Sequence, residues 1–214
     1  QPKNNFKIVS DKKARMILPN AITLVGVCIG LTSIKFALDG KFALAVVAIL
    51  FAGLMDALDG RIARLIKGTS KVGKELDSLG DVISFGVAPA FIMYFWNLQY
   101  LEKLGWFVCL IYVVCVALRL ARFNVSSNEE ATWKDDFFEG VPSPAGGIIV
   151  LMPLVLSFSG FGDLFFKINY DVIVPTFFII VSILLISTIP TYSFKRIVIP
   201  RSMTKFLLFG IVLF

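Results

Sequence analysis

Hydrophobic residues fill six long stretches of the chain, with short polar segments between them. These stretches cover residues 17–38, 42–66, 77–99, 104–123, 144–162 and 172–190. Each is long enough to cross about 30 Å of hydrocarbon as an α-helix. The pattern predicts an all-α membrane protein with a bundle of six core transmembrane helices. Because no long Ser- or Pro-rich linker divides the stretches, it also predicts a single domain over residues 1–214.

Two further segments flank these six stretches. Residues 1–16 are polar and basic and include a few apolar side chains, so they predict a cytosolic juxtamembrane segment. This segment is either an amphipathic helix lying on the membrane or a basic tail. Residues 203–214 are apolar but too short to span a bilayer. They are either an interfacial helix or a span cut off by the end of the sequence.

Composition and charge support a membrane location and suggest an orientation. The chain is 57% hydrophobic, with a mean hydropathy of +0.82 and a net charge of +6. If the N-terminus is cytosolic and six helices alternate, the opposite side receives only Lys35, Lys41, Lys103 and Lys167. This bias predicts an N-terminus and an acidic cluster that face the cytosol from the cell membrane. The net charge then indicates attraction to anionic membrane lipids, and no pattern suggests nucleic-acid binding.

Four aspartates lie where an apolar chain should tolerate them least: Asp56, Asp59, Asp77 and Asp81. A lone carboxylate near the bilayer centre costs roughly 2.5 to 3.5 kcal/mol unless it faces a partner, a polar cavity or a metal. Spacings of three and four residues place each pair on one helix face. Two neighbouring helices can therefore direct all four carboxylates at one hard divalent ion such as Mg²⁺ or Mn²⁺.

The aspartates belong to the pattern D-x-x-D-G-x-x-A-R-(x8)-G-x-x-x-D-x-x-x-D, which residues 56–81 match at every specified position. This pattern resembles the signature of the CDP-alcohol phosphotransferases. The resemblance implies that the four aspartates form a two-metal site, with two Mg²⁺ or Mn²⁺ ions bridging the diphosphate of a CDP-linked donor. It also implies that Asp81 is the general base that deprotonates the acceptor hydroxyl.

The resemblance further implies which residues bind the donor. Gly60, Ala63, Arg64 and Gly73 would line the cytidine and diphosphate site. Gly60 and Ala63 also form a small-residue patch that allows a ligand to approach the helix backbone. Asn20 and Thr23 near the start of the first stretch are expected to present polar groups to the donor, and Pro19 to open that helix.

Three segments outside the signature resemble those of membrane-bound phosphatidylserine synthases: residues 84–90, 119–124 and 138–144. They imply transfer of a phosphatidyl group to L-serine. Arg119 and Arg122, three residues apart, are expected to converge on the serine carboxylate, although both also fit as anchors at a cytosolic helix end. Ser84, Asn124 and Ser143 are further candidates for serine binding.

The implied partners are CDP-diacylglycerol, or a CDP-archaeol-type ether lipid, together with L-serine, membrane lipids and a second copy of the chain in a homodimer. Two alternatives stay open. The acceptor is glycerol 3-phosphate or inositol phosphate in the first, and the carboxylates line the path of a divalent-cation transporter in the second. The chain has no histidine, so a carboxylate must act as general base in any hydroxyl transfer.

Overall fold

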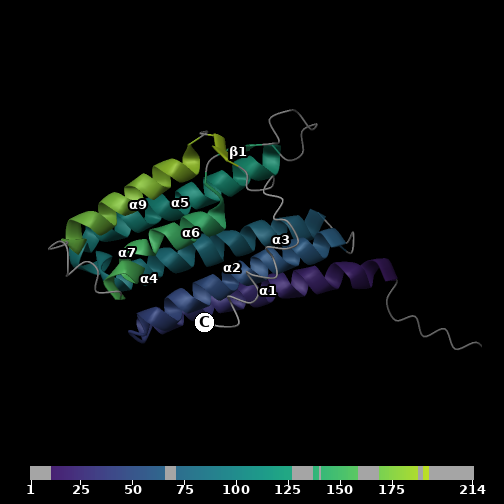
Figure 1. Ribbon diagram of the computed structural model, residues 1–214, viewed down its shortest axis with the longest axis horizontal. Coiled ribbons are helices and arrows are strands. Elements are labelled where there is room, and N and C mark those ends of the chain that lie inside the picture. The colour runs from purple at the N-terminus through teal and green to yellow at the C-terminus, as the bar shows by residue number, and fades with distance from the viewer. Residues whose placement is uncertain are drawn as a thin grey trace, which may run out of the picture.

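The computed structural model describes residues 11–65, 71–126, 137–139, 141–158, 169–187 and 190–192. Long helices run roughly along the same axis and make up almost all of this part (Figure 1). Helices long and apolar enough to span a membrane cover Ile17–Leu38, Phe42–Leu65, Val72–Trp96 and Leu98–Val125. These four agree with the first four predicted spans and make the protein a helical membrane protein.

The first two helices form an antiparallel hairpin. α1 (Asp11–Leu38) packs along α2 (Phe42–Leu65). Gly40, with a φ of 73°, ends α1 in a Schellman motif: its N–H donates to Ala37 O, and Lys41 N–H donates to Phe36 O. Because α1 already begins at Asp11, Pro19 lies inside the helix. The expectation that Pro19 opens the first helix was wrong.

The third span is one continuous helical rod with a change of pitch in its middle. It consists of α3 (Lys71–Asp81), a π-helical segment η1 (Val82–Val87) and α4 (Ala88–Trp96). η1 contacts α1, α2, α5 and α6 and so lies in the centre of the bundle. A short 3₁₀ turn, η2 (Leu98–Leu101), then leads into α5 (Glu102–Ser126).

The last two predicted spans correspond to shorter helices. The fifth is broken at Leu151 into α6 (Ser143–Val150) and α7 (Met152–Phe158), as expected where Pro153 lacks an N–H group. α9 (Tyr170–Ile186) is apolar but has 17 residues, and it packs along α5. The six-helix membrane bundle therefore stays a prediction. Residues 1–10 and 203–214 lie outside the described residues.

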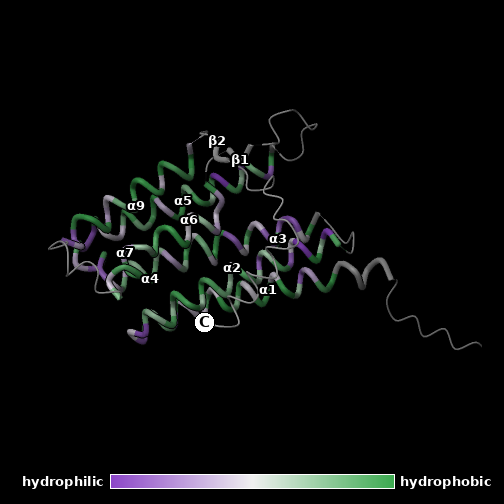
Figure 2. The backbone as a smooth tube through the Cα atoms, viewed as in Figure 1, coloured by the Kyte–Doolittle hydropathy of each residue, from purple (hydrophilic) through white to green (hydrophobic). Residues whose placement is uncertain are grey.

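Two short strands, β1 (Phe137–Glu139) and β2 (Pro190–Tyr192), pair antiparallel near the C-terminal ends of α5 and α9. The hydrophobic pattern of the sequence did not predict these strands. The hydrophobic core includes fully buried Ile49, Phe85, Tyr112 and Phe178 from different helices. Many other large apolar side chains are exposed, as expected of lipid-facing helices, while hydrophilic positions gather around α3 (Figure 2).

Candidate active site

One cavity of about 790 Å³ lies at the end of the bundle that contains α3, within the size range of small-molecule sites. It is formed by the N-terminal part of α1, the C-terminal part of α2, α3, the C-terminal part of α5 and the start of α6. Its lining residues are Pro19, Asn20, Thr23, Asp56, Ala57, Asp59, Gly60, Ala63, Arg64, Gly73, Lys74, Asp77, Asp81, Arg119, Leu120, Phe123, Pro142, Ser143 and Pro144.

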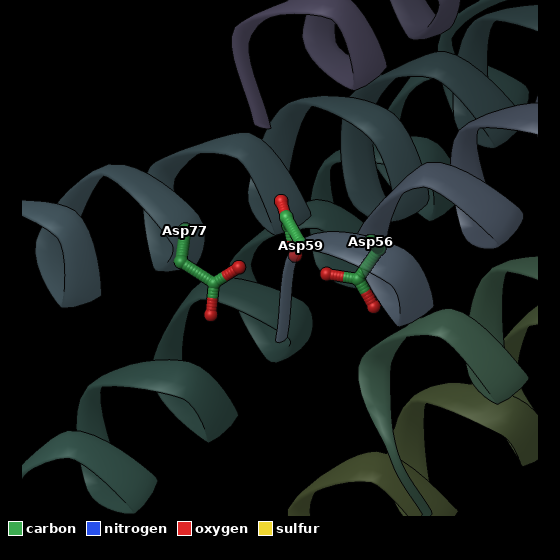
Figure 3. A group of neighbouring side chains, drawn as sticks. All are labelled: Asp56, Asp59 and Asp77. Carbon is green, nitrogen blue, oxygen red and sulfur yellow. The ribbon is translucent and has the colours of Figure 1, made fainter. Parts of the chain in front are cut away.

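All four aspartates of the signature reach this cavity. Asp56 and Asp59 share one face of α2, and Asp77 and Asp81 share one face of α3. Oxygen atoms of Asp56, Asp59 and Asp77 lie within 4.8 Å of one another, and Figure 3 shows the three carboxylates turned toward a common space. Asp81 completes the group, since it lines the same cavity and, together with the other three aspartates, the small hollow beside it.

Thr23 of α1 contacts the carboxylate of Asp59. Its hydroxyl lies 2.5 Å from Asp59 Oδ2 and can donate to it, and Asp59 is only 3% exposed. A hydrogen bond to a buried carboxylate restricts the orientation of that carboxylate. Thr23 was predicted as a donor-binding residue, and the structure records its hydroxyl against Asp59 Oδ2 and, at 3.1 Å, against Pro19 O.

This arrangement fits a divalent cation. Four carboxylates that approach one another in a partly buried space repel unless a positive charge lies among them. Within the part of the chain that the structure describes, no ion pair neutralises any of the four. Carboxylate oxygens from two helices are the donor set that Mg²⁺ and Mn²⁺ prefer.

Three basic side chains also line the cavity: Arg64 from α2, Lys74 from α3 and Arg119 from α5. Arg64 Nε donates to Gly60 O at 3.0 Å. Lys74 was not among the predicted site residues, although its position three residues before Asp77, on the same helix face, was a usable signal. These cations make the cavity suitable for an anionic ligand in addition to the metal.

The residues predicted for donor binding all come together at this cavity. Asn20, Thr23, Gly60, Ala63, Arg64 and Gly73 each contribute to its lining. α1 and α2 supply most of them because the hairpin places the N-terminal part of α1 beside the C-terminal part of α2. Their contacts with a donor stay a prediction.

The residues predicted for serine binding separate into two groups. Arg119 and Ser143 line the cavity, and Arg119 Nη1 donates to Ser143 Oγ at 2.9 Å. Arg119 also acts electrostatically on Asp81, and its Nε is buried without a hydrogen-bond partner among the described residues. Because Arg119 lines the cavity, its guanidinium is placed to contact a ligand beside Asp81.

The other three residues predicted for serine binding, Ser84, Arg122 and Asn124, are not part of the lining of this cavity. Ser84 is 4% exposed and borders a small hollow beneath the aspartates, which Asp81 also lines. The expected convergence of Arg119 and Arg122 on one carboxylate does not match the structure, because Arg122 Nη1 donates to Ile186 O at the end of α9, 3.0 Å away. Asn124 Nδ2 donates to Ser78 Oγ at 3.0 Å.

The candidate site is a cavity lined by four aspartates that suit a divalent cation, at the end of a bundle of membrane-spanning helices. The chain belongs to the CDP-alcohol phosphatidyltransferase family, which it matches over residues 16–189. Members of this family generally depend on divalent metal ions, in agreement with the aspartate cluster.

Curated relatives carry a more specific name. The chain is 38% identical over 197 residues to the CDP-diacylglycerol–serine O-phosphatidyltransferase of Mycobacterium tuberculosis, which covers 90% of this chain and 66% of the relative. It is 35% identical over 181 residues to the enzyme of the same name from Helicobacter pylori, covering 85% of this chain and 74% of the relative. The chain thus spans just under two thirds of the length of the mycobacterial relative.

Proposed function

We propose that this protein transfers the phosphatidyl group of CDP-diacylglycerol to the hydroxyl of L-serine and releases CMP. Where the membrane contains ether lipids, the donor is the corresponding CDP-archaeol-type lipid. The observation that carries the proposal is the meeting of four carboxylates and Arg119 in one cavity at the end of a membrane-helix bundle. The names of the relatives support serine as the acceptor.

The cavity offers separate groups to the two parts of the donor. Asn20, Gly60, Ala63 and Gly73 form the side on which the cytidine can lie close to backbone. Arg64 and Lys74 supply positive charge for the diphosphate. The exposed apolar surfaces of the helices leave the acyl chains in the lipid phase.

Asp56, Asp59, Asp77 and Asp81 are proposed to hold two Mg²⁺ or Mn²⁺ ions, as the resemblance implies. Such ions, when bound, neutralise the diphosphate and stabilise the departing CMP. Thr23 contributes by restricting the orientation of Asp59.

Arg119 binds the acceptor and Asp81 deprotonates it in this proposal. The guanidinium of Arg119, steadied by Ser143, binds the serine carboxylate and brings the hydroxyl to Asp81. Asp81 accepts the hydroxyl proton while the serine oxygen bonds to the lipid-bearing phosphorus. The bond from that phosphorus to the CMP oxygen breaks, and CMP leaves with the electron pair. Atoms and charge balance without a further reactant.

The test is an acceptor panel with purified protein, CDP-diacylglycerol and Mg²⁺ or Mn²⁺. We expect CMP release and phosphatidylserine formation that depend on L-serine. CMP release that depends instead on glycerol 3-phosphate or inositol phosphate would end the serine assignment while keeping the family chemistry. Divalent-cation flux into liposomes, independent of any CDP-lipid, would favour the transporter alternative.

We also propose that six helices cross the cell membrane, that the cavity faces the cytosol and that the protein is a homodimer. Basic residues at the cavity end of the bundle support this orientation, because positive charge favours the cytosolic side. Asp39, in the exposed turn between α1 and α2, lies at the opposite end. In a Cys28→Ser background, Asp39→Cys should react with a membrane-impermeant maleimide on intact cells, and protection there would reverse the orientation.

A further inference from the structure

The third membrane span changes from α-helical to π-helical geometry directly after Asp81. η1 covers Val82–Val87, and at its end the N–H of Ala88 donates to Ile83 O, five residues earlier. π-helical turns are rare and occur mostly as local bulges, frequently at functional sites. The position of this one, next to a carboxylate of the cavity, calls for a physical cause.

Pro89 provides that cause. In a regular α-helix the N–H of residue 89 would donate to the carbonyl of Phe85, four residues earlier. Proline has no N–H, and its ring crowds that same carbonyl, so a wider turn relieves the contact. The Phe85 carbonyl then lacks its usual donor deep in the bundle, where an unsatisfied backbone group is costly.

Tyr112 of α5 supplies the missing donor. Its hydroxyl donates to Phe85 O at 2.7 Å. Both residues are fully buried, at 0% and 1% exposure. The Tyr112 ring packs edge-on against Phe178 of α9, with centroids 5.3 Å apart, so the hydroxyl has a defined position. A side chain from another helix therefore replaces the hydrogen bond that Pro89 removes.

Gly147 of α6 also packs closely against the backbone of Phe85. A Cβ atom on Gly147 would lie 2.9 to 3.0 Å from Phe85 Cβ, Cα and O. Only glycine allows this approach without a shift of the Phe85 backbone. The backbone of η1 is thus held between Tyr112 and Gly147.

We propose that Tyr112 is a positioning residue for the transfer reaction. Its hydrogen bond fixes the π-helical turn, and the turn sets the direction in which Asp81, the residue directly before it, meets Asp56 and the acceptor. Asp77 lies one helical turn further from η1, and Asp56 and Asp59 lie on α2, so they depend less on this turn. The role rests on the proposed function, because it concerns the residue assigned there as the base.

The experiment compares Tyr112→Phe with the parent protein in detergent, with saturating CDP-diacylglycerol, L-serine and Mn²⁺. The variant keeps the ring against Phe178 and loses only the hydroxyl. We expect kcat, expressed per donor-binding site, to fall roughly 10- to 100-fold, because small displacements of a reacting group have effects of this size. The apparent affinities for CDP-diacylglycerol and Mn²⁺ should stay within about threefold of the parent, since most of their ligands lie outside the turn.

Two controls separate positioning from general loss of structure. Tyr100→Phe changes a tyrosine that is 72% exposed in η2 and should leave kcat unchanged. If Tyr112→Phe yields no folded protein, Gly147→Ala disturbs the same turn from α6 and should give the same fall in kcat. Its matched control is Gly53→Ala, whose Cβ would meet the Phe85 ring at an ordinary 3.6 Å.

Three outcomes of these measurements would contradict the proposal. A kcat of Tyr112→Phe within twofold of the parent overturns the positioning role. So does a loss of kcat that appears together with an equal loss of donor and metal affinity, because that pattern indicates a structural role alone. A parent protein that converts no CDP-diacylglycerol overturns the proposed function, and the role of Tyr112 with it.

Discussion

Replacing Arg119 by lysine tests how the cavity recognises the acceptor. Arg119 lines the cavity. It donates a hydrogen bond to Ser143 Oγ and interacts electrostatically with Asp81. A lysine keeps the positive charge but cannot bind a carboxylate through two parallel N–H groups. We therefore expect Arg119→Lys to raise the apparent KM for L-serine, with a smaller effect on the KM for CDP-diacylglycerol.

The size of the effect follows from the number of hydrogen bonds lost. One hydrogen bond to a charged group contributes about 1.5 to 3 kcal/mol. Loss of one of two bonds to the serine carboxylate corresponds to a roughly 10- to 150-fold higher KM, since about 1.36 kcal/mol is a factor of ten. Initial rates of CMP release, measured against serine concentration at saturating donor and metal, give this number directly.

Arg122→Lys is the matched control, on the same helix and three residues away. Arg122 is exposed and donates to Ile186 O at the end of α9. Its replacement should lower the thermal stability slightly and leave the serine KM within twofold of the parent. The reasoning fails if Arg119→Lys also stays within twofold, or if Arg122→Lys raises the serine KM as much as Arg119→Lys does.

The other predictions concern the carboxylates and the metal. Asp77→Asn should reduce turnover below about 1% of the parent even at saturating Mg²⁺ or Mn²⁺, because it removes a charged metal ligand; Asp39→Asn, at the far end of the bundle, should keep full activity, and a few-fold effect of Asp77→Asn would contradict the metal assignment. Asp81→Asn should still bind CDP-diacylglycerol and metal but form phosphatidylserine about 10²- to 10⁴-fold more slowly, since an amide cannot accept the hydroxyl proton. Near-normal kcat in that variant would remove Asp81 as the base. Chelation with EDTA should abolish CMP release and added Mn²⁺ or Mg²⁺ should restore it; activity that survives chelation and dialysis would argue against a metal-dependent reaction.

Local patterns in the sequence were sufficient to predict much of this protein. Apolar stretches of 20 or more residues predicted the first four spans, because the thickness of the bilayer sets the length of a crossing helix. The spacings Asp56–Asp59 and Asp77–Asp81 predicted shared helix faces, since residues three or four apart lie on one side of a helix. Both are properties of a single helix, and the structure agrees with them, since it has the four spans and all four aspartates line one cavity. The family resemblance of the signature agrees with the family that the chain matches.

Contacts between helices were beyond the reach of those patterns. The spacing of Arg119 and Arg122 predicted that both lie on one helix face and bind the same carboxylate. In the structure, Arg119 donates to Ser143 of α6, whereas Arg122 donates to Ile186 O at the end of α9. The spacing of Lys74 from Asp77 was visible, but only the packing of α3 against its neighbours brings Lys74 to the cavity.

The π-helical turn η1 also depends both on the local sequence and on contacts between helices. The prediction of one uninterrupted stretch over residues 77–99 made no use of Pro89, although the loss of its N–H is a local property of the chain. Whether that loss produces a kink, a break or a wider turn depends on what can satisfy the freed Phe85 carbonyl. Tyr112, 27 residues away in sequence, donates to it, and Gly147 leaves room for its backbone. The sequence by itself determined which residues carry the charge and where the helix is weak. The tertiary structure decided how the weak point is held, because hydrogen bonding and close packing depend on neighbours that only the folded bundle brings together.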